Sequence, residues 1–448
     1  MSEYSPVLER DLALAQQRSV GSASALDGVD TALAAACALV AMLISAWGFA
    51  TLGPALDTEH SFNIWFQADT PRVVLNLTDL ASNHYRTAVH PISSLLTTPL
   101  VLALAKAGVP PLLACKALIA LAGGACAALL FITGRLLRLG RLDAALVVAL
   151  FLTSAAYLHW YGQIELSAFS GVTIVLSLLL LVRESLAAPV WWVLMSAATL
   201  SITVTNWVAG LAATFARWPL RGFAAISAGA FVLVCLLAIA QQHAMTNAQL
   251  FFKYSSARNE TQWTQMAMER HGRGTWSPAR SLYSLFVTTA VAPMPQRESK
   301  QGVTVVTNQR PTLADMTWLS LTAIAAWIGL LACGAYAGWH VRHLRRVGIG
   351  IGLMLLAQAL LHSIYGDVTF LYAAHVIPML VGLAALAFAS PARHFARVAA
   401  LVVVVAGGLN NVGQFRAAAA FANDILRSGG NAVDPVFNGG VLRSGLSG

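Results

Sequence analysis

The stretch richest in side chains that can do chemistry runs from Asp57 to Pro91 and reads DTEHSFNIWFQADTPRVVLNLTDLASNHYRTAVHP. Only 10% of the chain is charged, yet this stretch combines carboxylates, arginines and histidines: Asp57, Glu59, Asp69, Asp79, Arg72, Arg86, His60, His84 and His90. A carboxylate there could take a proton from an attacking hydroxyl group, and an arginine could bind a phosphate. We expect this stretch to carry the reacting groups.

Asp69 is the strongest candidate for a catalytic acid. It lies in FQADTPRV, with Arg72 three residues further on. The carboxylate is placed to accept a proton, and Arg72 could orient it or contact a phosphate. A structural interpretation competes, in which Asp69 caps a helix that starts at Thr70-Pro71 and forms an i,i+3 ion pair. Local spacing does not separate the two.

Glu165, in HWYGQIELSAF, is the second candidate acid. It is the only acid in a short connection between two apolar runs, and carboxylates at a membrane edge are costly enough to suggest a function. The alternative is an exposed acid at a helix N-terminus, where the helix dipole favours it.

Two further groups are candidates for binding substrate. His90 and Arg86 lie where a phosphate could reach them, although His90-Pro91 also reads as a helix start. Asp367, Tyr372 and His375 lie in YGDVTFLYAAH at another helix mouth. A tyrosine in such a place is often only an interfacial anchor.

The composition predicts an all-α polytopic membrane protein. The chain has 448 residues, of which 57% are hydrophobic, and its mean hydropathy is +0.67, too apolar for a soluble protein. The net charge of +9 comes from clusters between apolar runs, a pattern that excludes nucleic acid as a partner and is typical of cytoplasmic loops. The five cysteines all lie within apolar runs and form no CxxC pair.

The arginine-rich connections predict about eleven transmembrane helices. Basic residues occupy every second short connection, so the positive-inside rule puts the N-terminus in the cytoplasm only if Ile92–Ala105 does not cross. We therefore expect Ile92–Ala105 to be a juxtamembrane helix. The predicted spans are Thr31–Thr51, Leu112–Thr133, Ala144–Leu158, Leu166–Val182, Val190–Val204, Trp207–Ala216, Phe223–Ala240, Leu313–Gly338, Val347–Leu361, Phe370–Ser390 and Val398–Leu409. Two of them, Val190–Val204 and Trp207–Ala216, are short and are expected to meet at a break at Thr205-Asn206.

This topology divides the chain into a cytoplasmic tail (1–30), a transmembrane domain (31–412) and an outward-facing C-terminal tail (413–448). The domain contains an outward-facing first loop at 53–110 and a larger outer loop at 241–312. The larger loop is basic, and its Lys253 and Arg258 are candidates for binding an anionic substrate.

These features together resemble the GT-C superfamily of membrane glycosyltransferases, which includes protein O-mannosyltransferases and the aminoarabinose transferases of lipid A. The resemblance rests on the first helix, the acidic motif FQADTPRV, the following His-Pro and the acid in GQIEL. It implies that Asp69 and Glu165 are the catalytic acids. The doubled proline and basic residue usual in that family are absent after His90.

The resemblance implies transfer of a sugar from a polyprenyl-phosphate donor to a glycan, lipid or protein acceptor, as in the synthesis of cell-envelope polysaccharide. The active site would face the periplasm from a bacterial inner membrane, in contact with membrane lipids. Arg72, Arg86, Lys253 and Arg258 would stabilise the leaving phosphate. Some members of the family use Mg²⁺ or Mn²⁺. A transporter or flippase of a lipid-linked saccharide is the alternative, although inverted repeats and charges at mid-membrane depth would be expected for it.

Overall fold

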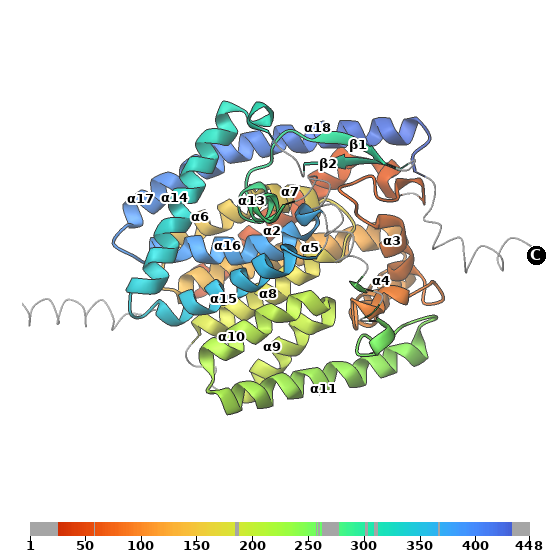
Figure 1. Cartoon of the computed structure of the whole chain (residues 1–448), viewed down its shortest axis with the longest axis horizontal. Coiled ribbons are helices and arrows are strands. Elements are labelled where there is room, and N and C mark those ends of the chain that lie inside the picture. Colours follow the sequence, from red (N-terminus) through yellow and green to blue (C-terminus); the bar gives the residue numbers. More distant parts are fainter. Residues whose placement is uncertain are drawn as a thin grey trace, which may run out of the picture.

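The computed structural model describes residues 26–57, 59–183, 188–256, 258, 260–261, 277–300, 303–308, 312–365 and 368–431. Helices dominate it (Figure 1). The first half contains α2 (Gly28–Leu52), α3 (Thr70–Thr78), α4 (Ser93–Lys106), α5 (Pro111–Leu136), α6 (Arg141–Leu152), α7 (Ala155–Trp160), α8 (Ser167–Val182), α9 (Pro189–Ile202), α10 (Trp207–Arg217) and α11 (Leu220–Ala244). The second half contains α13 (Pro278–Tyr283), β1 (Gln296–Lys300), β2 (Val303–Thr307), α14 (Trp318–His340), α15 (Arg345–His362), α16 (Ala373–Phe388), α17 (Arg393–Val402) and α18 (Gly408–Arg427).

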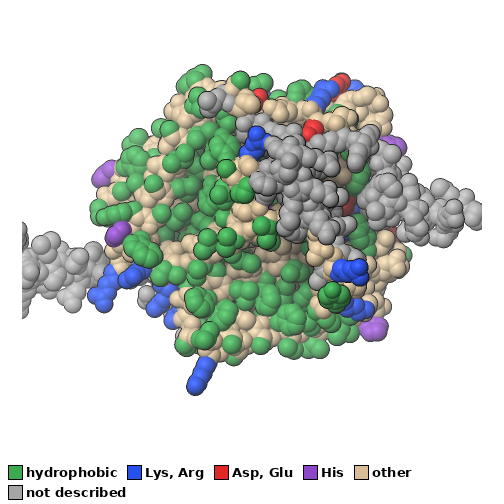
Figure 2. Space-filling model, in the orientation of Figure 1, with side chains coloured by type: hydrophobic (Ala, Val, Ile, Leu, Met, Phe, Trp, Pro, Cys, Tyr) green, Lys and Arg blue, Asp and Glu red, His purple; other side chains and the backbone are tan. Residues whose placement is uncertain are grey.

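The described chain contains 6 helical segments long and apolar enough to cross a bilayer: Gly28–Leu52, Pro111–Leu136, Leu220–Ala244, Trp318–His340, Thr369–Phe388 and Arg393–Arg427. Shorter apolar helices accompany them, namely Ser93–Lys106, Ser167–Val182 and Pro189–Ile202. Hydrophobic side chains also spread over the face shown in Figure 2, as expected for a surface in contact with lipid. The prediction of a helical integral membrane protein is confirmed.

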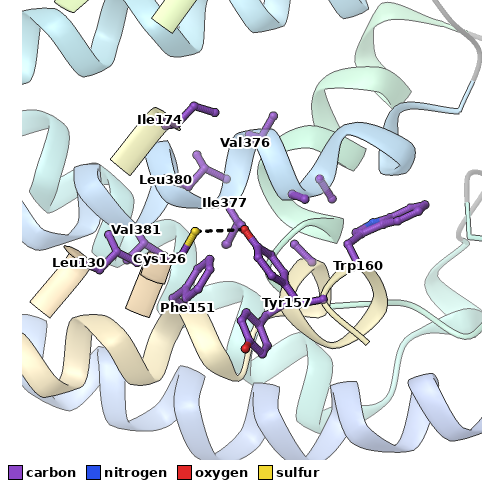
Figure 3. Packing of buried hydrophobic residues seen from close by; sticks show 14 of the residues in the cluster. Cys126, Leu130, Phe151, Tyr157, Trp160, Ile174, Val376, Ile377, Leu380 and Val381 are labelled. Atoms are coloured by element: carbon purple, nitrogen blue, oxygen red, sulfur yellow. Dashed lines mark hydrogen bonds between the residues drawn. The ribbon is translucent and has the colours of Figure 1, made fainter. Parts of the chain in front are cut away.

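The core lies where α5, α8 and α16 pack together, with α2 and α14 on their outer sides (Figure 1). Nearly every residue of α16 is buried, which explains why its sequence is apolar on all faces rather than along one stripe. Figure 3 shows the packing around Cys126, whose sulfur lies 3.5 Å from the Tyr161 hydroxyl. The rings of Tyr157 and Tyr161 stack with centroids 4.6 Å apart. Tyr161 is the first residue after α7, so this packing anchors the connection that follows α7 in the core.

The predicted span Ala144–Leu158 is not one continuous helix, because the chain breaks between α6 and α7. Ser154 starts the second helix, and its hydroxyl accepts a hydrogen bond from the Tyr157 N–H (3.1 Å). The first N–H groups of α7 are satisfied from a distant segment, since Ala155 and Ala156 donate to the carbonyls of Ala290 and Thr289. Because the residues on both sides of the break are apolar, the sequence pattern does not reveal it.

The predicted helix end at Leu409 is wrong. The last helix continues as α18 to Arg427. A π-helical turn, Val403–Gly407, joins α17 to α18, and π turns are a common cause of bends in long helices. The residues after 412 are polar and rich in alanine, so they form a helix without an apolar signal. The segments 1–25 and 432–448 lie outside the described residues.

The larger predicted loop at 241–312 is folded in the parts that the structure describes. It contains α13, a π-helical turn at Ser284–Thr288 and an antiparallel hairpin in which Gln296 pairs with Thr307. The architecture is therefore not purely α. The strand VTVVT is rich in β-branched residues, which favour the extended conformation. The sequence did not predict this strand, because a run of five residues does not stand out among many apolar segments.

The break between α9 and α10 is confirmed, with a 3-10 turn at Val204–Asn206. The side chain of Asn206 donates to the Thr173 hydroxyl on α8 (2.7 Å), which fixes the turn to its neighbour. The expected helix at Ile92–Ala105 is present as α4, packed against α3 and α5.

Two buried acids accept hydrogen bonds from arginines of the short connections. They lie at the end of the bundle opposite α3 and α4 (Figure 1). Asp30 on α2 accepts hydrogen bonds from Arg135 (3.0 Å) and Arg141 (2.9 Å). Asp143 accepts from both Arg393 and Arg397, each at 2.7 Å, and is 0% exposed. These arginines therefore stabilise the bundle in addition to any role in orienting the chain.

Candidate active site

The segment that leads into α3 is held in an uncommon backbone conformation. Asn63, Phe66 and Gln67 all have positive φ (60°, 48° and 64°), a conformation that costs of order 1 kcal/mol or more for residues other than glycine. Trp65 and Phe66 insert into the core and are each 1% exposed. The Trp65 indole N–H donates to the carbonyl of His159 (2.9 Å). These anchors fix the position of Asp69, three residues after Phe66.

Asp69 occupies the N-cap position of α3, but its carboxylate forms no capping hydrogen bond. It pairs instead with the Arg72 guanidinium one turn further on. Its second oxygen, Oδ1, is buried and has no hydrogen-bond partner in the described structure. The predicted i,i+3 pair is present, and the predicted capping bond is not. A free, buried carboxylate oxygen is available to accept a hydrogen bond from a ligand.

Glu165 lies on the connection between α7 and α8, and only 9% of it is exposed. Burial raises the pKa of this carboxyl to about 7, although the nearby Arg72 guanidinium lowers it. One of its oxygens accepts a hydrogen bond from the Leu166 N–H (2.9 Å). A carboxyl with a pKa near neutral pH is suited to exchange protons during catalysis.

Close backbone packing positions this connection beside α3. The Gln163 amide donates to the Thr70 hydroxyl at the start of α3. Gly162 lies against Gly48 of α2, where a Cβ atom on Gly48 would come within 2.8 Å of the Gly162 Cα. Only two glycines allow this approach, so α2 sets the distance between the two candidate acids.

Arg86 and His90 follow α3 and reach the same region. The charges of Arg86 and Arg72 both act on His90 and on Glu165. Burial, followed by these charges, lowers the pKa of His90 to about 3, so His90 is neutral at physiological pH. Its Nδ1 lies 2.9 Å from the Ile202 carbonyl. Because a carbonyl only accepts, Nδ1 carries the hydrogen and Nε2 is an acceptor.

Tyr372 and His375 enter from the start of α16. Their ring centroids are 6.1 Å apart, and the Tyr372 ring lies 4.1 Å from that of His362. The charge of Arg86 acts on the Tyr372 hydroxyl. The structure thus brings together seven of the residues selected from the sequence: Asp69, Arg72, Arg86, His90, Glu165, Tyr372 and His375.

In the part of the chain that the structure describes, Lys253 and Arg258 form no recorded contact with this group, although Glu260 of the same segment bonds to Arg86. Lys253 and Arg258 are both exposed, on the segment that follows α11. No ion pair among the described residues connects either of them to Asp69 or Glu165. Asp367, the remaining candidate at the mouth of α16, lies outside the described residues.

The sequence analysis did not select Glu260, Tyr365 or His362, although Tyr365 is the first residue of YGDVTFLYAAH. The Glu260 carboxylate bonds to Arg86 (3.0 Å) and accepts from the Tyr365 hydroxyl (2.8 Å). Because 174 residues separate Arg86 from Glu260, no local spacing links them. His362 ends an apolar helix, and a lone histidine there carries no signal of its own.

A divalent metal has no ready-made site in the described residues, among which no three His, Cys, Asp or Glu side chains are grouped to hold one. No known protein family, curated protein or solved structure matches this chain.

Proposed function

We propose that this protein transfers a sugar from a polyprenyl-phosphate donor to a hydroxyl group of an acceptor outside the cytoplasm. One observation carries the proposal: Asp69 forms an ion pair with the buried Arg72, and the charge of Arg72 also acts on a second buried acid, Glu165. A second arginine, Arg86, lies close enough to act on Glu165. Carboxylates next to cations suit a reaction in which a hydroxyl loses a proton while a phosphate leaves.

The chemistry follows from these charges. The acceptor oxygen attacks the anomeric carbon of the sugar, and the proton of that hydroxyl passes to Oδ1 of Asp69. The bond between the anomeric carbon and the phosphate oxygen breaks, and the phosphate leaves with the electron pair. Arg86 stabilises the negative charge of the leaving phosphate. Arg72 holds the Asp69 carboxylate in place for the proton transfer.

Glu165 has a supporting role in this scheme. Its pKa of about 7 means that it exists in both protonation states at neutral pH. In its protonated form Glu165 can donate a hydrogen bond to a sugar hydroxyl or to the departing oxygen. The charges of Arg72 and Asp69 both act on Glu165, so the protonation of one acid affects the other.

The proposed mechanism needs no divalent cation. The charge of Arg72 acts on both acids, and a Mg²⁺ or Mn²⁺ held by one or two of these carboxylates, water and the donor phosphate would compete with it. Transfer measured with and without added Mg²⁺ tests whether a cation takes part.

The proposal includes a topology. We infer about eleven membrane crossings with the N-terminus in the cytoplasm, so that the arginines held by Asp30 and Asp143 face inward and the two candidate acids face the periplasm of a bacterial inner membrane. The positive-inside rule supports this orientation. A polyprenyl-linked sugar presented in the outer leaflet would reach Asp69 from that side.

A transporter or flippase of a lipid-linked saccharide is the second candidate, favoured by the buried polar side chains of Asn206, Gln358 and His362 between apolar helices. Purified protein is incubated with polyprenyl-phosphate sugars that carry a radioactive sugar, together with a membrane extract as the source of acceptor. Release of free polyprenyl phosphate supports the transferase. A donor that stays intact under every acceptor condition contradicts it.

A further inference from the structure

The carboxylate of Glu260 is held by two groups from distant parts of the chain. Oε1 lies 3.0 Å from Arg86 Nη1 in the connection after α3. Oε2 accepts a hydrogen bond of 2.8 Å from the Tyr365 hydroxyl, just after α15. The side chains of Arg86 and Glu260 are 24% and 21% exposed, so the pair is partly open to its surroundings. One anionic group thus occupies a site built from a guanidinium and a phenol.

The two arginines of the candidate site differ in how firmly their partners are held. Arg72 is paired with Asp69, three residues away on the same turn of helix. The partner of Arg86 is 174 residues away in the chain, so the two can separate without unwinding a helix. Partly exposed ion pairs contribute little to stability. An anionic ligand can therefore displace Glu260 from Arg86 with only a small loss of stabilising free energy.

The donors at this site suit a phosphate as well as a carboxylate. A guanidinium bonds to the oxygens of either anion. Burial raises the pKa of the Tyr365 hydroxyl, which keeps it protonated and able to donate. Two exposed apolar residues precede Tyr365 closely in the sequence, since Leu360 is 62% and Ile364 55% exposed. An apolar chain attached to a phosphate at Arg86 and Tyr365 could pack against such side chains.

We propose that Arg86 and Tyr365 form the binding site for the phosphate of a phosphate-bearing lipid, and that the Glu260 carboxylate occupies this site until the lipid displaces it. The inference rests on the proposed function, because it concerns the donor and the lipid product of the same reaction. Glu260 then weakens lipid binding and assists release of the product. Tyr365 and Glu260 become determinants of affinity without taking part in the transfer of the sugar.

The test measures binding of farnesyl phosphate to the full-length protein in detergent, with farnesol as the uncharged control. Replacing Glu260 with Gln (Glu260→Gln) removes the competing charge and should tighten binding by about fivefold, the size expected for a partly exposed ion pair. Tyr365→Phe and Arg86→Gln should weaken it, the latter by about tenfold or more. Asp424→Asn is the matched control, since it removes a charge from an exposed ion pair with Arg297, and it should leave binding unchanged.

A double variant shows whether Glu260 acts through Arg86. In the Arg86→Gln background, Glu260→Gln should give no gain, because the cation for which the anions compete is gone. The inference is overturned if Glu260→Gln binds farnesyl phosphate no more tightly than the wild type, or if its gain survives the loss of Arg86. Thermal unfolding of each variant, measured with and without farnesyl phosphate, separates an effect on binding from a loss of fold.

Other sources of phosphate are separate arms of the experiment. Inorganic phosphate and phosphatidylglycerol should displace farnesyl phosphate only at far higher concentration, and displacement at equal concentration by either would contradict a lipid-phosphate site. The result of this binding test is also independent of the result of the test for sugar transfer. Altered binding without any sugar transfer would refute the transferase and keep the site, whereas transfer with unaltered binding would refute the site alone.

Discussion

Asp69 and Glu165 meet the demands of acid-base chemistry in different ways. Asp69 is paired with Arg72 and keeps one buried oxygen free, so it is the acid able to accept the proton of an incoming hydroxyl. Glu165 is more deeply buried, and its pKa is about 7, so it can hold a proton at neutral pH. The charges of Arg72 and Asp69 both act on Glu165, so a change in the charge of one acid alters the pKa of the other.

Asp69→Asn should lower the rate of sugar transfer by about 10²–10⁴-fold, the usual cost of losing a general base. Because Arg72 is only 4% exposed, the variant also leaves the buried guanidinium charge less well paired and should reduce stability. The rate is therefore expressed per mole of folded protein, as isolated by size-exclusion chromatography. Asp79→Asn, at an exposed acid of the same loop, is the control and should keep its activity.

Asp69→Asn combined with Arg72→Gln removes the unpaired charge and should also be inactive. A near wild-type rate in folded Asp69→Asn would show that Asp69 has only a structural role. Loss of activity in Glu165→Gln alone would then move the reacting acid to the connection before α8.

The raised pKa of Glu165 predicts how stability changes with pH. Burial favours the protonated form in the folded state, so the stabilisation is fully present below the ordinary pKa near 4.5 and is lost as the pH rises through about 7. The Tm of the wild type should therefore fall between pH 5 and pH 8. Glu165→Gln should melt with a weaker dependence on pH and, at pH 8, at a temperature no lower than the wild type. An equally steep fall in this variant would assign the dependence to another group.

Much of the candidate site could be predicted from residue types alone. Asp69, Arg72 and Arg86 are conspicuous because charge is rare in the chain, and Glu165 because it is alone between two apolar runs. Glu260 and Tyr365 could not be predicted, since their importance comes from long-range contacts with Arg86. The neutral state of His90 could not be predicted either, because it depends on burial.

Among the elements, α2 determines how the connection after α7 approaches α3. Gly48→Ala places a methyl group 2.8 Å from the Gly162 backbone, so the connection that carries Glu165 must move or α2 must shift. We expect a loss of at least tenfold in transfer rate, because small displacements of catalytic groups are costly. Gly413→Ala, at a glycine with open space around it, is the control and should behave like the wild type.

Asn411 on α18 holds the break before α7 against the segment around Ala290. Its amide donates to the carbonyls of Thr153 (2.8 Å) and Ala290 (2.7 Å) and accepts from the Ala292 N–H (2.8 Å). Asn411→Ala removes three hydrogen bonds and leaves the Ala292 N–H and the Thr153 carbonyl without this partner, whereas the Ala290 carbonyl keeps its bond from the Ala155 N–H. The variant should destabilise the protein by about 2 kcal/mol or more. Asn423→Ala, which loses a single bond to the Leu52 carbonyl, should cost less. Equal thermal melting of the two variants would contradict this role.

The helices were predictable where apolar runs were long and bounded by charge, as for α2, α5 and α11. The sequence did not predict the break at Thr153-Ser154, because serine and threonine are common inside membrane helices and the hydrogen bonds that satisfy the break come from residues 289 and 290. It also did not predict α18, whose helical tendency comes from alanine rather than from an apolar face.

For the whole molecule, the proposed topology puts the candidate acids and the arginine-rich connections on opposite sides of the membrane. Cysteines introduced at Ala81 and His343, both exposed, report the two sides. A charged thiol reagent that does not cross the membrane should label Ala81→Cys in intact spheroplasts, and His343→Cys only after lysis. Labelling of His343→Cys in intact spheroplasts would contradict the orientation.

The most direct test of the central claim follows both halves of the donor at once. The protein is reconstituted in liposomes with a polyprenyl-phosphate sugar labelled with ³H in the sugar and ³²P in the phosphate, and a membrane extract supplies the acceptor. A transferase separates the labels, so that ³H appears in the acceptor and ³²P remains as free polyprenyl phosphate in equal amounts. If both labels stay on one molecule and only change leaflet, the protein is a transporter and the account is wrong.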